Sequence, residues 1–218
     1  DQTGFGKGRI QAAIARYIAL NGGTVVFITV KSNLFSDFWR DINDINSTDI
    51  FTNPLLLNAD SKILDINDPD MPVVCKTWKK DILNTCIENK KLPDDTNFVC
   101  LSYSQLSRKG KKTDFIEEIC KGVHINGDEI HNAVGDSTTS EILNNASKVS
   151  KSTTFSSATF ARDVLNLSFY DNVFPWLQEI KGKESYSPSL KRALAEENRF
   201  KMLALGLTCF LDNHEMFV

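Results

Sequence analysis

Apolar positions along the chain form two kinds of pattern, continuous runs and helical stripes. Residues 24–30 and 97–103 are apolar on both faces, which is typical of parallel strands covered by helices on both sides. Helical spacing marks residues 10–20, 32–42 and 113–121, where apolar side chains recur every three or four positions. The order of helix, strand and helix predicts an α/β fold built on a mostly parallel sheet.

Weaker patterns fill the rest of the chain. Further short strands are predicted at residues 61–66, 73–77, 123–127 and 153–159. Further helices are predicted at residues 79–89, 139–149 and 189–205. Ser32 is the expected N-cap of the helix at 32–42. Residues 163–218 are predicted to be mostly helical.

Composition excludes several classes of protein. The 218 residues are 41% hydrophobic with a net charge of −3, so the chain lacks the overall basic character of many nucleic-acid binders. No apolar run approaches the ~20 residues of a membrane helix, and no signal peptide is recognised. The five cysteines are odd in number and have no CxxC spacing, which predicts reduced thiols. We therefore expect a cytoplasmic or nuclear protein that is not secreted and does not bind a membrane.

A glycine-rich turn with a lysine, Gly4 to Gly8, leads directly into the first predicted helix. Glycines let backbone N–H groups turn inward toward phosphate oxygens, and a helix N-terminus and a lysine add positive charge. The Walker A pattern is kept only in part, because Asp1 replaces its first glycine and Gly8 its Mg²⁺-binding hydroxyl. A flexible surface turn is the alternative. Since a buried strand normally precedes such a loop, we expect that strand upstream of residue 1.

Two adjacent carboxylates, Asp128 and Glu129, follow the strand predicted at 123–127. Ligands of α/β folds bind where strands end, and this pair is typical of Walker B geometry. In that geometry one carboxylate holds Mg²⁺ and its neighbour positions the attacking water. An exposed acidic turn is the alternative.

These motifs occur together in one order: Gly-x-Gly-Lys, a strand ending before Lys31-Ser32, another ending at Ser102-Tyr103, then Asp-Glu-x-His and Ser-Ala-Thr. The set resembles the first motor domain of superfamily 2 helicases and translocases, a RecA-like P-loop NTPase. Gly-Lys-Gly-Arg in place of Gly-Lys-Thr is similar to the strawberry-notch-type helicase family, which also occurs in phage and bacteria. The resemblance covers nearly the whole chain.

The resemblance implies ATP and Mg²⁺ as cofactors, and it assigns roles to residues at matching positions. Lys7 would contact the β- and γ-phosphates, Asp128 would hold Mg²⁺ through water, and Glu129 would position the hydrolytic water. The stretch expected to bind the nucleotide is Thr3, Gly4, Phe5, Gly6, Lys7, Gly8 and Arg9, and Thr3 or water would complete the Mg²⁺ shell. The residues expected to couple the phosphate state to nucleic acid are His131, Ser157 and Thr159. The residues expected to contact nucleic acid, DNA in the first place, are Lys31, Ser32, Ser102 and Tyr103.

On this interpretation residues 1–165 form the RecA-like ATP-binding domain. Residues 166–218 form a helical extension of it, leading toward a second RecA-like domain that would supply arginine fingers. The alternatives are a P-loop NTPase that does not act on nucleic acid and a catalytically inactive interaction module. DNA versus RNA, unwinding versus duplex translocation, polarity and oligomeric state stay open.

Overall fold

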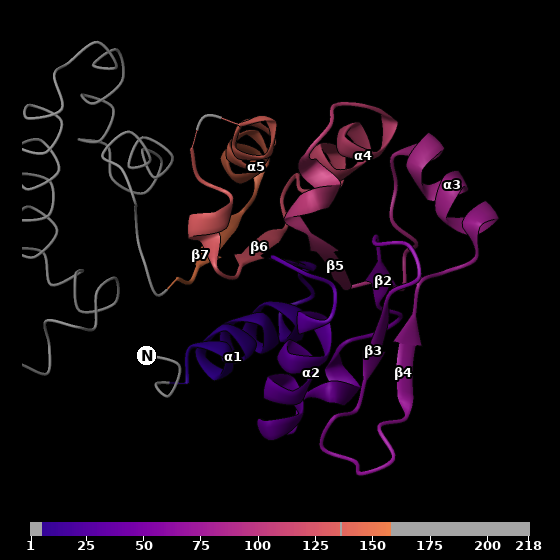
Figure 1. Ribbon diagram of the computed structural model, residues 1–218, viewed down its shortest axis with the longest axis vertical. Helices are drawn as coiled ribbons and strands as arrows, with labels where there is room; N and C mark the ends of the chain where they lie inside the picture. Colours follow the sequence, from indigo (N-terminus) through magenta and orange to yellow (C-terminus); the bar gives the residue numbers. More distant parts are fainter. Residues whose placement is uncertain (1–5, 136, 158–218) are drawn as a thin grey trace, which may run out of the picture.

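The computed structural model describes residues 6–135 and 137–157, and its centre is a five-stranded sheet (Figure 1). The strands lie in the order β2-β5-β1-β6-β7, and every pairing between them is parallel. Their bounds are Leu55–Leu56 (β2), Phe98–Ser102 (β5), Val25–Thr29 (β1), His124–Gly127 (β6) and Ser152–Phe155 (β7). The predicted α/β fold with a mostly parallel sheet and flanking helices is confirmed.

Helices cover both faces of this sheet. The helices α1 (Lys7–Leu20) and α2 (Leu34–Asp44) lie on one side in Figure 1, and α3 (Lys80–Asn89), α4 (Lys111–Ile119) and α5 (Thr138–Val149) lie on the other. Side chains alternate between the two layers along β1. Val25 and Phe27 belong to the core with α1 and α2, whereas Val26 and Ile28 belong to the core with α4 and α5. This double coverage explains why β1 and β5 are apolar throughout.

A two-stranded antiparallel sheet lies beside the main one, between β2 and α3 in the chain. It pairs β3 (Lys62–Leu64) with β4 (Val73–Lys76), the two short strands predicted from sequence. β3 packs against α2, where the Leu64 N–H donates to Ser36 Oγ at 3.0 Å. The two-residue strand β2 was not predicted, because Leu55 and Leu56 are too short a run to show a period.

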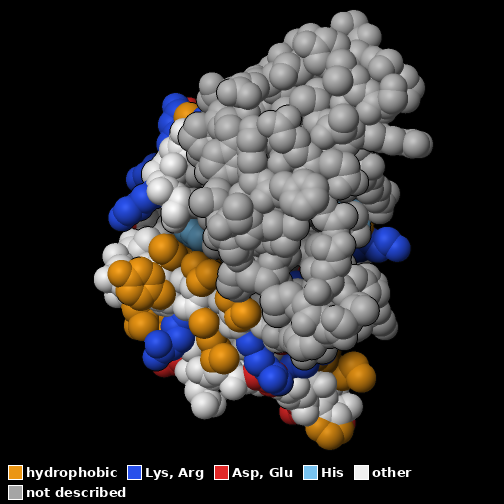
Figure 2. All heavy atoms as spheres, turned by 90° about the vertical axis from the view of Figure 1, so that its left-hand side faces the viewer, with side chains coloured by type: hydrophobic (Ala, Val, Ile, Leu, Met, Phe, Trp, Pro, Cys, Tyr) orange, Lys and Arg blue, Asp and Glu red, His pale blue; other side chains and the backbone are white. Residues whose placement is uncertain are grey.

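Helix α1 has one face built for close packing and another that stays exposed. Ala12 and Ala15 are fully buried against α2, and Gly8 continues the same face toward the helix N-terminus. Ile10, Tyr17 and Leu20 remain more than half exposed. Figure 2 shows one side of the molecule, where exposed hydrophobic side chains lie near one another. The small residues let the two helix backbones approach closely.

The structure gives Asn33, not Ser32, as the N-cap of α2, and no side chain caps that end. Backbone N–H groups of Leu34, Phe35 and Ser36 instead bond to carbonyls three residues earlier, so the turn closes without Ser32. The predicted helical extension at 166–218 and its boundary lie outside the described residues.

Within the part of the chain that the structure describes, no helix combines the length and apolar character needed to cross a bilayer.

Candidate nucleotide-binding site

The carboxyl edge of the sheet brings the predicted acidic pair close to the start of α1. The buried Gln11 side chain donates from Nε2 to the Gly127 carbonyl at 3.3 Å, which ties α1 to the end of β6. Lys7 lies one helical turn before Gln11 on the same face. The lysine and the carboxylates, far apart in the chain, therefore belong to one edge of the fold, as α/β ligand sites require.

Asp128 is fixed by hydroxyl groups from both neighbouring strands. Ser156, just after β7, donates to Asp128 Oδ1 at 2.9 Å, and Thr29, the last residue of β1, donates to Oδ2 at 3.2 Å. The Asp128 N–H continues the ladder by bonding to the Ile28 carbonyl at 2.8 Å. The carboxylate is thus held in one orientation, while each oxygen keeps lone pairs for a further partner.

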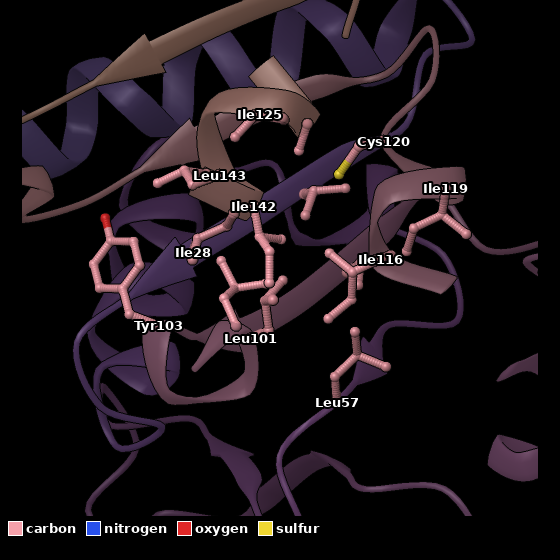
Figure 3. Close-up of a cluster of buried hydrophobic side chains, with 14 of the residues drawn as sticks. Ile28, Leu57, Leu101, Tyr103, Ile116, Ile119, Cys120, Ile125, Ile142 and Leu143 are labelled. Carbon is pink, nitrogen blue, oxygen red and sulfur yellow. The ribbon is translucent and has the colours of Figure 1, made fainter. Parts of the chain in front are cut away.

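The backbone of Asp128 has its own anchor in the core beneath the site. Tyr103 donates from its hydroxyl to the Asp128 carbonyl at 2.7 Å. Its ring stands at one end of the apolar cluster, with the hydroxyl directed away from that cluster (Figure 3). Gly127 is needed here, since a Cβ at this position would lie 2.9 Å from the Phe155 ring and 3.5 Å from the Tyr103 hydroxyl.

Glu129 begins a short turn that also carries His131. Its backbone is left-handed, with φ 49° and ψ 47°, and it precedes the 3₁₀ turn Ile130–Asn132. His131 Nδ1 lies 2.6 Å from Ser157 Oγ and 3.2 Å from Glu129 Oε2. The predicted coupling residues His131 and Ser157 are therefore in contact, and Glu129 contacts the same nitrogen of the His131 ring. Thr159 lies outside the described residues.

The N-terminus of α1 is only partly described. Thr3, Gly4 and Phe5 lie outside the described residues, so the predicted phosphate loop stays a prediction. Gly6 is the N-cap, with φ 73° in the left-handed region that favours glycine.

Gly8 and Arg9 both face α2, which contributes two acidic residues. A Cβ on Gly8 would lie only 1.9 Å from Asp41 Oδ2, so the close approach of α2 explains this glycine. Arg9 donates from Nε and Nη2 to Asp44 Oδ2 at 3.1 and 2.7 Å. The pKa of Asp44 is lowered by its hydrogen bond to Arg9, whereas burial raises the pKa of Asp41. The side chain of Arg9 is thus directed at α2, and only its backbone N–H remains a candidate for a phosphate.

The predicted nucleic-acid contacts divide into two groups. Lys31 is exposed and Ser32 is half-buried, whereas Ser102 and Tyr103 are only 2% and 6% exposed. The Ser102 hydroxyl is engaged with Asn58 Nδ2 and with the Ser104 hydroxyl, each at 2.7 Å. Ser102 and Tyr103 therefore support the edge of the sheet from its interior. Of these four residues, Lys31 and Ser32 are the ones that a ligand could reach.

Three contributing residues were not singled out from the sequence: Thr29, Ser156 and Asn132. The first two follow from a general rule, because carboxyl ends of neighbouring parallel strands meet at one edge. Asn132 has no such signal, since its role depends on the fold of a three-residue turn.

The sequence matches no protein-family profile and no curated protein. Among solved structures it is similar to a nuclease-deletion mutant of the Type ISP restriction-modification enzyme LlaGI, in complex with a DNA substrate mimic. The TM-score is 0.44 at 16% sequence identity, and the match covers 72% of this chain and 15% of that chain. The chain thus corresponds to a small part of that enzyme's length. A likeness at this level decides neither fold nor function, which rest on the geometry above.

Proposed function

We propose that the chain is the ATP-binding and ATP-hydrolysing domain of a nucleic-acid motor of the superfamily 2 type. One observation carries the proposal. Asp128 is oriented by hydroxyls from both neighbouring strands, at the edge where α1 begins. An acidic group held this firmly, at the edge of the sheet to which the first helix of the chain is tied, suits a phosphate with its metal ion better than it suits a surface turn.

The donor set fits Mg²⁺ bound together with a nucleotide. Among the described residues no group of three or more His, Cys, Asp or Glu side chains could hold a metal ion by itself. Mg²⁺ usually needs no such cage, because one or two carboxylates, waters and substrate phosphates complete its shell. Asp128 would hold the ion, which would neutralise charge on the phosphate oxygens. Lys7 and the backbone N–H groups of the preceding loop would bind the phosphates.

Glu129 is the candidate for positioning the hydrolytic water. Its carboxylate is one-third exposed and reaches His131, so solvent retains access to it. The contact between His131 and Ser157 would transmit structural changes at the phosphate site to the rest of the domain. Lys31 and Ser32 would contact the backbone of the nucleic acid, with DNA as the first candidate.

The first experiment is ATP hydrolysis by the parent chain, with and without single- and double-stranded DNA, beside a Lys7→Ala variant. Arg16→Ala is the matched control, because it removes an exposed positive charge from the same helix. Stimulation by DNA that disappears in Lys7→Ala and persists in Arg16→Ala is the expected result. Hydrolysis that ignores nucleic acid would instead indicate a P-loop NTPase with another task.

The 218-residue chain by itself should bind MgATP or MgADP weakly and hydrolyse ATP slowly. The reason is that such motors complete their catalytic site with arginines from a second RecA-like domain. Turnover by these residues alone at the rate of a complete helicase would contradict the proposed dependence on a second domain.

An inactive interaction module is the second candidate, and one observation favours it. The space that a Walker A hydroxyl would occupy at residue 8 is taken by the Asp41 carboxylate. Nucleotide binding separates the two candidates, since an inactive module would show no Lys7-dependent binding of MgADP by calorimetry.

A further inference from the structure

Asn132 makes two hydrogen bonds with a single amide nitrogen. Its Nδ2 donates to the Glu129 carbonyl at 3.1 Å, and the same Nδ2 lies 3.0 Å from His131 Nε2. The backbone N–H of Asn132 also bonds to the Glu129 carbonyl, at 3.0 Å, so backbone and side chain both close this turn. The amide is thereby held between the backbone of Glu129 and the ring of His131.

The partners determine which way the amide faces. A carbonyl oxygen only accepts hydrogen bonds, so the amide nitrogen, not its oxygen, must face Glu129. That nitrogen has two protons, and the second is directed at His131 Nε2. A ring nitrogen that accepts a hydrogen bond carries no proton of its own. In this geometry Nε2 is therefore unprotonated.

The proton of the neutral ring must then be on Nδ1. Nδ1 faces Ser157 Oγ at 2.6 Å and Glu129 Oε2 at 3.2 Å, and both oxygens can accept that proton. With the proton on Nε2 instead, the bare lone pair of Nδ1 would face the Glu129 carboxylate, and the two would repel.

We propose that Asn132 is a positioning residue that fixes His131 as the Nδ1–H tautomer and so directs one proton at both Ser157 and Glu129. The ring then links the hydroxyl beyond β7 to the carboxylate expected to position water. Either contact can strengthen as the other lengthens, without a change of tautomer. The importance of this link for catalysis rests on the proposed function, but the tautomer itself does not.

The test is ¹⁵N–¹H correlation NMR of the histidine rings in the 218-residue chain, at a pH where they are neutral. A His131→Gln variant assigns the ring signals among the three histidines of the chain. The expected spectrum of the native protein shows a protonated Nδ1 and an unprotonated Nε2 for His131. A protonated Nε2 in the native protein would overturn the proposal.

Asn132→Asp is the decisive variant because it keeps the shape of the side chain and replaces the donor with an acceptor. We expect a proton to appear on Nε2, because the new carboxylate can only accept a hydrogen bond. Asn145→Asp adds the same charge at an exposed position of α5 and should leave the ring signals unchanged. Asn132→Ala removes the donor altogether and should shift the ring toward the Nε2–H form.

An unchanged tautomer in both Asn132 variants would refute the role of Asn132, whatever their stability. The backbone amide spectrum of β6 and α5 shows whether each variant is folded. ATP hydrolysis is measured separately in the parent chain. A native Nδ1–H tautomer in a protein without ATPase activity would contradict the proposed function alone, whereas an active enzyme with the Nε2–H form would contradict this inference alone.

Discussion

The Ser156 hydroxyl lies 2.9 Å from Asp128 Oδ1, and the two residues directly follow the neighbouring strands β7 and β6. Thr29 approaches the other carboxylate oxygen from the strand on the opposite side. Since β6 lies between β1 and β7 in the sheet, the carboxylate is held from both flanks. Its orientation thus depends on the carboxyl ends of three adjacent strands.

Replacement of Ser156 by Ala should weaken this orientation. Partners that orient a metal-binding carboxylate typically contribute about 10-fold or more to metal affinity or activity. We expect Ser156→Ala to raise the Mg²⁺ concentration needed for half-maximal nucleotide binding about 10-fold, measured by titration calorimetry. Ser150→Ala, which removes a hydroxyl at the end of α5, should have no such effect. Equal Mg²⁺ dependence in both variants would exclude this role of Ser156.

Introducing a Walker A hydroxyl at Gly8 should destabilise the fold. The new Cβ would lie 1.9 Å from Asp41 Oδ2, and overpacking of this kind typically costs about 1–3 kcal/mol. Gly8→Ser should therefore lower the free energy of unfolding, measured with urea, and Asp41→Ala in the same chain should restore most of the loss. Gly110→Ser is the control, because no residue that the structure describes lies within 4 Å of a Cβ there. If the loss persisted in the double variant, Asp41 would not be its cause.

His124 should make stability depend on pH. Burial lowers the pKa of this histidine, so the unfolded chain takes up a proton at a higher pH than the folded chain does. As pH falls below about 6.5, stability should decrease by up to about 1.4 kcal/mol per pH unit until the lowered folded-state pKa is reached. Its Nδ1 is paired with Ser152 at 2.8 Å, while its Nε2 has no partner among the described residues. Urea unfolding between pH 5 and about 8 should show a flatter profile for His124→Asn. Parallel profiles would assign the pH dependence to other groups.

Removal of the exposed residue Lys31 should weaken nucleic-acid binding. Loss of one phosphate contact weakens binding at all sequences and reduces the salt slope by about 1. We expect this for Lys31→Ala, measured by fluorescence anisotropy with a labelled DNA at several salt concentrations. Lys90→Ala, at the far end of α3, should bind as the native protein does. A normal salt slope for Lys31→Ala would place the interface elsewhere.

The sequence was a good guide wherever burial is continuous. The strands at Val25–Thr29 and Phe98–Ser102 are buried at every position, and long apolar runs showed them without ambiguity. The helix ends were less predictable. Ser32 has the chemistry of an N-cap, but the chain closes that turn with backbone bonds, and α2 begins two residues later.

The site was predictable in position and not in detail. Asp128 and Glu129 were placed at a strand end from their spacing alone, and the structure has them there. Ser102 is the last residue of β5 and Tyr103 follows it, yet both are buried, because a side chain at or just after a strand end can turn inward as readily as outward. The alternation of side chains between the two faces of a sheet predicts where a side chain lies only within the strand itself.

The pairing of β1 bears on how the chain folds. Val25 pairs with Phe98 on one side and with His124 on the other, so the central strand obtains both neighbours only from distant parts of the chain. Folds dominated by such non-local parallel pairings form slowly. During synthesis the run Val25–Thr29 therefore emerges long before β5 and β6 exist to cover its edges. A nascent chain of this kind is prone to aggregate, and it is a natural client for chaperones that shield apolar segments until translation is complete.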